Sequence, residues 1–157
     1  MNIYVVNEQN SLIIPLTQVR LVVEQVLKDE NCRCDEISIN FVDEATICQL
    51  HLEFFNDDSP TDCITFPIDE EDDNCYRVLG EVFICPYTAL KYAKKHETDP
   101  YLELTLYLVH GLLHLLKYDD IEKADRALMR KAEKRNMKNL IKLGLNIRES
   151  TLQPKIV

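Results

Sequence analysis

Glycine and proline are scarce in this chain, with 3 and 6 residues among 157. Collagen-like, linker-rich and low-complexity classes are therefore excluded. No apolar run extends beyond a few residues, so a membrane-spanning helix is excluded as well. The chain instead holds 46% hydrophobic and 29% charged residues. That balance is typical of a globular protein, and the length fits a single domain over residues 1–157.

Basic side chains are outnumbered and unevenly distributed. The chain carries 18 Lys and Arg against 27 Asp and Glu, a net charge of −9. This argues against loose, sequence-blind binding to nucleic acid, which depends on neutralising phosphates. Residues 1–116, however, carry 7 basic and 21 acidic side chains, whereas residues 117–157 carry 11 and 6. The basic end is either a surface for an anionic partner or a solvated helix face, and charge alone does not decide.

The six cysteines do not have the setting of a secreted disulfide framework. Residues 1–8 have no basic region and no long apolar stretch, unlike a signal peptide. We therefore expect free thiols in a reducing cytoplasm. Cys32 and Cys34 form a lone C-x-C with no second pair at zinc-finger spacing, so a structural zinc site there is disfavoured.

Hydrophobic periodicity predicts an α+β domain, an α/β sandwich. Strands are predicted at residues 3–6, 36–42, 63–67 and 80–85. Helices are predicted at residues 16–27, 45–55, 86–95, 100–116 and 124–143. The helix at 100–116 is apolar nearly all round, which predicts that it is buried. We expect a mixed sheet of about four strands packed with about five helices, and a metal site in a cleft.

His110 and His114 are the most informative residues. Four positions apart, they share one face of the predicted helix about one turn apart. Two imidazoles so placed can bind one metal ion, with zinc–nitrogen bonds of about 2.0–2.1 Å. The helix is predicted to end within residues 117–120, where Asp119 and Asp120 offer a third ligand. Three protein ligands leave the fourth position to water, as in catalytic rather than structural zinc sites.

The alternative is that both histidines are ordinary core residues. Burying an imidazole with no partner costs about 1–3 kcal/mol, and a shared metal would remove that cost for both. Gly111 stands where the H-E-x-x-H motif has its glutamate, so the general base of a zinc protease is missing. Peptide hydrolysis is therefore disfavoured.

The segment HGLLHLLKYDD at residues 110–120 resembles the signature H-G-x-L-H-L-x-G-Y-D-H of the YbeY family of bacterial endoribonucleases. It differs at two positions, where Lys117 replaces glycine and Asp120 replaces the third histidine. The blocks PTDCITFP at 60–67 and GEVFI at 80–84 are similar to the family motifs P-T-D-V-L-S-F-P and G-D-I-x-I. Order and spacing agree over roughly residues 35–145, which is most of the chain.

This resemblance implies an α/β fold with one zinc ion held in a cleft. It implies a single-strand-specific endoribonuclease that matures the 3′ end of 16S ribosomal RNA and acts in ribosome quality control, with ribosomal RNA and the small ribosomal subunit as partners. His110, His114 and Asp120 would be the ligands, and Asp119 would lie beside them. A carboxylate ligand also widens the choice of metal toward iron or manganese.

The resemblance also shows what is missing for phosphate binding. Phe55 stands where family members usually carry an arginine, a residue suited to gripping a phosphate. Lys117 is a candidate substitute because it lies near the metal ligands in the sequence. Basic residues recur at three- and four-residue steps in the last predicted helix. The candidate RNA contacts there are Arg126, Arg130 and Lys134, with Lys131, Arg135, Lys138 and Lys142 alongside. A solubilising face is the alternative.

The mechanistic hypothesis is that the metal lowers the pKa of its water from about 15.7 toward 7. The resulting hydroxide would attack an RNA phosphodiester, with Asp119 or Glu81 orienting it. For Asp62, a hydrogen bond within a turn is as good an interpretation as a role in the site. The competing hypothesis is a ribosome-assembly binding factor with a mainly structural metal, which Phe55 and Asp120 favour somewhat.

Overall fold

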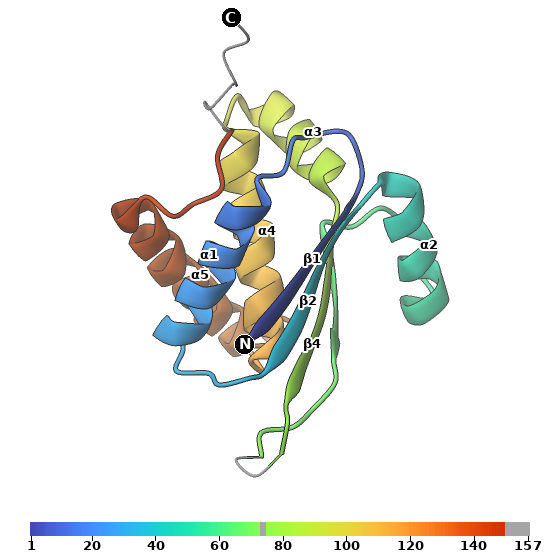
Figure 1. Ribbon diagram of the computed structural model, residues 1–157. Coiled ribbons are helices and arrows are strands. Elements are labelled where there is room, and N and C mark those ends of the chain that lie inside the picture. The colour runs from blue at the N-terminus through green and yellow to red at the C-terminus, as the bar shows by residue number, and fades with distance from the viewer. Residues whose placement is uncertain (73–74, 150–157) are drawn as a thin grey trace, which may run out of the picture.

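A four-stranded mixed sheet lies at the centre of the structure, a computed structural model that describes residues 1–72 and 75–149 (Figure 1). The strands are β1 (Asn2–Glu8), β2 (Glu36–Val42), β3 (Cys63–Pro67) and β4 (Val78–Ile84). Their order across the sheet is β1-β2-β4-β3. Strands β1, β2 and β4 are parallel to one another, and β3 runs antiparallel to β4 at one edge of the sheet.

Five helices surround the sheet in the described part of the chain. They are α1 (Leu16–Asp29), α2 (Glu44–Phe55), α3 (Pro86–His96), α4 (Pro100–Leu115) and α5 (Lys123–Leu143). Helices α1, α4 and α5 lie on one side of the sheet, and α2 lies on the other (Figure 1). The predicted fold class, a mixed sheet of four strands with five helices, is confirmed.

The predicted boundaries differ from the observed ones mainly where pairing extends a strand. β1 runs from Asn2 to Glu8 rather than over 3–6, because each of its residues has a partner on β2. β4 begins at Val78, and Cys85 is the N-cap of α3 rather than the end of the strand. Both boundaries depend on a neighbouring element, which a local pattern does not contain.

Helix α4 is the centre of the main hydrophobic core. Asp99 caps it by accepting the N–H of Tyr101 at 2.9 Å, and Pro100 occupies the first helical position. Its apolar side chains pack with those of α1, α5 and the sheet in one cluster. A smaller cluster of Val42, Ile47, Ile64 and Cys85 lies under α2. The prediction that α4 is buried is confirmed.

Gly111 sets how closely α4 approaches the sheet. A Cβ at this position would lie 2.7 Å from Cγ1 of Val82 and 2.8 Å from Sγ of Cys63. Real Cβ atoms do not make such contacts, so only glycine fits without a shift. A glutamate at 111 would point into β3 and β4, which explains in physical terms why the protease motif has no place on this helix.

All six cysteines lie in the described ranges, and all are free thiols, as expected from the sequence. Over those same ranges, no helix combines the length and the apolar character needed to cross a membrane.

Candidate metal centre

Asp120 reaches the two histidines because the chain reverses immediately after α4. Lys117 adopts a left-handed conformation with φ +76°. Its N–H donates to the carbonyl of His114, and the N–H of Tyr118 donates to the carbonyl of Leu113. This pair of hydrogen bonds is the Schellman motif, which ends many helices and usually has glycine at the left-handed position. The reversal carries Asp120 back beside the helix.

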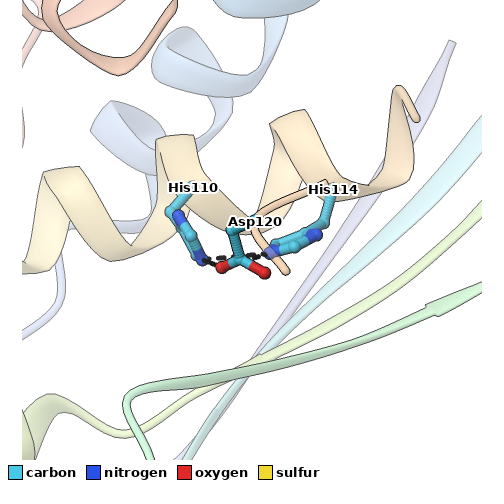
Figure 2. A group of neighbouring side chains, drawn as sticks. All are labelled: His110, His114 and Asp120. Atoms are coloured by element: carbon cyan, nitrogen blue, oxygen red, sulfur yellow. Dashed lines mark hydrogen bonds and ion pairs between the residues drawn. The ribbon is translucent and has the colours of Figure 1, made fainter. Parts of the chain in front are cut away.

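The three predicted ligands meet in space (Figure 2). Nε2 of His114 lies 3.1 Å from Nε2 of His110. Oδ2 of Asp120 lies 3.3 Å from Nε2 of His114 and 3.5 Å from Nε2 of His110. The two imidazole side chains are 24% and 25% exposed, and the Asp120 side chain is 42% exposed. The cluster is therefore partly buried but open to solvent on one side.

The spacing of these atoms fits a metal ion. Two ligands of a tetrahedral ion with bonds of 2.0–2.1 Å are about 3.3–3.4 Å apart. The three observed separations, 3.1, 3.3 and 3.5 Å, lie around that value. In the described part of the chain, these residues are the only group of three or more His, Cys, Asp and Glu side chains close enough to share an ion.

Glu133 of α5 determines which ring nitrogen of His110 carries the proton. Oε1 of Glu133 lies 2.7 Å from Nδ1 of His110. A carboxylate only accepts, so Nδ1 carries the proton and Nε2 has a free lone pair on the side that faces His114 and Asp120, where an ion could bind. A carboxylate behind a ligating histidine is the usual arrangement in metal sites. Glu133 was not predicted from the sequence, because it lies 23 residues from His110 and no local pattern links the two.

The charges around His110 favour a cation. Burial lowers the pKa of His110, but its hydrogen bond with Glu133 and the negative charges of Glu133, Asp62 and Asp120 outweigh burial, so the pKa is raised. The surroundings that hold a proton on this imidazole would also stabilise a metal ion beside it.

Asp119 supports the loop that carries Asp120. Its Oδ1 accepts the backbone N–H of Asp120 at 2.7 Å. The carboxylate thus orients the backbone of Asp120 and lies outside the group of three residues that could share an ion. This is the position beside the ligands that the sequence resemblance implies.

A cavity of about 360 Å³ opens onto the cluster. It is formed by the end of α2, the start of β3, α4 and the loop that follows α4. The lining residues are His51, Phe55, Thr61, Asp62, Cys63, Ile64, Thr65, His110, His114, Asp119, Asp120 and Ile121. The expected cleft is present, and Asp62 contributes a third carboxylate to it. For Asp62 the sequence left a turn and a role in the site equally open, and the structure places it in this cleft; His51 was not predicted to lie there.

Glu81 lies on the wrong face of the sheet to orient a water molecule at this centre. Val82 faces Gly111 of α4. Adjacent side chains of a strand point to opposite faces, so Glu81 points away from α4. Of the two carboxylates proposed for this role from the sequence, only Asp119 lines the cavity, and the prediction for Glu81 is wrong.

Lys117 is not beside the ligands. Its Nζ lies 3.1 Å from Oε1 of Glu70, and the residue lines two other cavities outside the metal cleft. The left-handed turn that brings Asp120 inward directs the Lys117 side chain toward the loop after β3. Lys117 is therefore close to the candidate ligands in the sequence but not in the structure.

The predicted RNA contacts of α5 separate into two groups. Arg126 and Arg130 are seven and three residues before Glu133, so they share the helix face that reaches His110. Lys134 follows Glu133 directly and is turned away by about 100°. All three basic residues are exposed, and the guanidinium of Arg126 donates to the carbonyl of Ile121 at 2.8 Å.

Comparison with known proteins gives consistent matches over most of the chain. The family model described as Endoribonuclease YbeY matches residues 4–141. A protein of that description from Protochlamydia amoebophila (strain UWE25) is 54% identical over 142 residues, which cover 90% of this chain and 95% of the relative. Another from Chlamydia trachomatis serovar D is 37% identical and covers 83% of each chain.

A solved structure resembles the fold. The solution structure of TM1509 from Thermotoga maritima superimposes with a TM-score of 0.65 at 26% sequence identity. The match covers 91% of each chain, so the likeness extends over sheet and helices together.

Proposed function

Because this chain belongs to the YbeY family of endoribonucleases, we propose that it is a single-strand-specific metallo-endoribonuclease. Its substrate would be ribosomal RNA, cut during maturation of the 16S 3′ end and in ribosome quality control. The observation that carries the proposal is the convergence of His110, His114 and Asp120 in the lining of a cleft open to solvent. The small ribosomal subunit is the proposed partner, and the cytoplasm the proposed compartment.

One divalent ion per chain would be held by His110, His114 and Asp120, with zinc the first candidate. When bound, such an ion supplies a Lewis acid that lowers the pKa of water and offsets phosphate charge. Asp120 adds a negative charge where a third imidazole would be neutral, so the ion would be a weaker acid than with three histidines. The same carboxylate suits iron or manganese.

The chain's own residues would orient and hold the reacting groups. Glu133 keeps the proton on Nδ1 of His110, and Asp119 holds the loop of Asp120 through its backbone N–H. Asp62 lines the same cavity, where its carboxylate can accept a proton from an attacking water. The exposed Arg126 and Arg130, on the face of α5 that carries Glu133, would attract the RNA backbone.

The second candidate is a ribosome-assembly factor whose metal is structural. Phe55 favours it, because an aromatic side chain in the cleft offers no charge to a phosphate. Asp120 favours it too, because a weaker Lewis acid activates water less.

The test is cleavage of a precursor of the 16S 3′ end, in single-stranded and duplex form. Wild-type protein should cut the single strand, and His114→Ala should lower the rate by at least about 100-fold, as expected when a group acting on the transition state is lost. His96→Ala is the matched control, because His96 lies at the exposed end of α3 and should leave the rate unchanged. Metal-loaded wild type that cuts nothing would favour the assembly factor.

A further inference from the structure

A cluster of aromatic rings extends from the sheet to the edge of the metal cleft. Phe66 of β3 packs edge-on against Phe83 with ring centroids 5.7 Å apart, and against Phe54 at 4.9 Å. Phe55 stacks beside Phe66 at 6.5 Å with an interplanar angle of 29°, and its ring lies 5.9 Å from that of His51. Phe55 thus packs against Phe66, whose ring is held in the sheet by its contact with Phe83.

Phe55 is the member of this cluster that opens into the cleft. It is 55% exposed, and it lines the cavity that contains His110, His114 and Asp120. Phe54 is 57% exposed, but it does not line that cavity. Phe55 therefore differs from Phe54 in its position and not in its exposure: its half-exposed ring offers a flat apolar face to a ligand inside the cleft of the candidate metal centre.

The local backbone keeps Phe55 in place. α2 ends at Phe55, because Asn56 takes a left-handed conformation with φ 54°. Nδ1 of His51 lies 2.8 Å from the carbonyl oxygen of Ser59, which ties the following loop back onto the helix. The ring is therefore presented from a capped helix end and not from a free loop, which limits the entropy lost when a ligand stacks on it.

The charge of the cleft indicates how RNA would be held there. Its lining carries the carboxylates of Asp62, Asp119 and Asp120, and among the described residues that line it there is no lysine or arginine. Phosphate contacts from the protein wall would therefore be weak, and contact with a base becomes the available source of affinity. Base–aromatic stacking is strong and tolerant of sequence.

We propose that Phe55 is the stacking platform for one nucleobase of single-stranded RNA, next to the phosphate that faces His110, His114 and Asp120. This inference rests on the proposed function and adds to it the binding mode of the substrate. A base within a duplex is covered on both faces by its neighbours, so only a splayed, unpaired nucleotide can use the platform. The platform thus accounts for the single-strand preference by the shape of this chain's own cleft.

The experiment measures binding of a fluorescent single-stranded RNA with the 16S 3′-end sequence, in EDTA so that no cleavage occurs, and KM in a parallel metal-loaded assay. Phe55→Leu keeps an apolar side chain but removes the ring, and should weaken binding and raise KM by about 5- to 150-fold. Phe55→Tyr keeps the ring and should remain within about 2-fold of wild type. Phe54→Leu is the matched control and should bind as wild type does.

Abasic substitution identifies the base. When successive nucleotides are replaced by abasic ones, one replacement should weaken binding to wild type by the same factor by which Phe55→Leu weakens binding of intact RNA. That replacement should not weaken binding to the Phe55→Leu variant any further. Equal binding of Phe55→Leu and wild type, or additive losses at every position, would overturn the platform. A loss confined to binding of the small ribosomal subunit, with RNA binding intact, would overturn it too, since the ring would then serve a protein contact.

The two proposals fail in different ways. If wild type cuts RNA and Phe55→Leu binds and cuts equally well, only the platform is refuted. If wild type neither binds nor cuts single-stranded RNA, both are refuted. Circular dichroism and thermal unfolding of Phe55→Leu, Phe55→Tyr and Phe54→Leu show whether each variant is folded, so a loss of binding can be assigned to the ring.

Discussion

At the level of single residues, the carboxylates around His110 decide what the candidate site can hold. Glu133 binds one ring nitrogen, and Asp120 lies 3.5 Å from the other. Asp62 adds a further negative charge, and together these groups overcome the effect of burial on the pKa of His110. A site so surrounded is suited to a cation and not to an anion. The consequence can be tested at Glu133, which would touch no metal itself.

Glu133→Gln should weaken zinc binding by about 10- to 100-fold, because the ligand His110 loses the negative partner that fixes its tautomer and raises its basicity. Competition against a chromogenic zinc chelator measures this affinity. Glu122→Gln is the control, since Glu122 is exposed and makes no side-chain cap at the start of α5. Equal affinity of Glu133→Gln and wild type would show that Glu133 plays no part in metal binding.

At the level of elements, local pattern was a good guide to helices and strands, and a poor guide to how they end and pair. The alternation in β2 and the proline at the start of α4 are contained in the sequence, and both predictions were confirmed. The extension of β1 depends on β2, and the left-handed turn at Lys117 lacks the glycine that would predict it from the sequence. The first depends on pairing with a strand that is distant in the sequence, and the second on a backbone conformation that residues other than glycine rarely adopt.

Lys117→Gly should stabilise the protein by up to about 1 kcal/mol, because glycine adopts the left-handed conformation without the cost of roughly 1–2 kcal/mol that other residues bear. The ion pair with Glu70 is exposed and contributes little. Lys117→Ala is the control, since it removes the same side chain but keeps the strain. Urea unfolding compares the three proteins, and a glycine variant no more stable than the alanine variant would contradict this account of the turn.

Glu30 joins the end of α1 to α5. It accepts hydrogen bonds from Arg135 and Asn136 at 2.6 and 2.8 Å, and from Tyr118 at 3.1 Å. Burial of its side chain, which is 10% exposed, raises its pKa, but these hydrogen bonds and the charge of Arg135 lower the pKa below its usual value of 4.5. Its contribution to stability is therefore present above pH 4.5 and is lost as the pH falls through the lowered pKa.

Glu30→Gln should cost about 1–2 kcal/mol of unfolding free energy at pH 7. The difference from wild type should shrink as the pH falls below the usual pKa of a glutamate, because wild type then loses its charge as well. Urea unfolding at neutral and acid pH measures both, with Glu24→Gln on the exposed face of α1 as control. A difference that stays constant across this range would mean that the Glu30 charge is not what stabilises the contact.

At the level of the whole molecule, the candidate site combines one segment that the sequence reveals with several that it does not. His110, His114 and Asp120 lie within eleven residues, so spacing alone predicts that they can meet. Glu133 comes from α5 and contacts His110, and Phe55 comes from α2 and lines the cleft; only the packing of distant elements brings them to the site. Long-range contacts of this kind have no local pattern, so the meeting of the three clustered residues was predictable from spacing, whereas the contact of Glu133 with His110 was not.

The uneven charge of the chain has a consequence for RNA binding. The logarithm of the association constant for single-stranded RNA falls as the logarithm of the salt concentration rises. Arg126→Gln combined with Arg130→Gln should make this slope less steep by about 1.4, since each single-strand phosphate contact contributes about 0.7. Lys131→Gln combined with Lys138→Gln removes the same charge from the side of α5 opposite Glu133, and should leave the slope nearly unchanged. Fluorescence anisotropy over a salt series measures both slopes. Equal slopes for the two double variants would show that Arg126 and Arg130 do not contact the RNA backbone.

The ability of His110, His114 and Asp120 to hold one divalent ion is tested most directly by the metal content of the freshly purified protein. Elemental analysis should find one equivalent of zinc, iron or manganese per chain in wild type. Asp120→Ala should lower that content well below one equivalent, Asp120→His should restore it, and Asp58→Ala, which removes an exposed acid elsewhere, should not change it. Wild type that stays free of metal when dialysed against each of these ions, or Asp120→Ala and His114→Ala variants that keep a full equivalent, would contradict the proposed site.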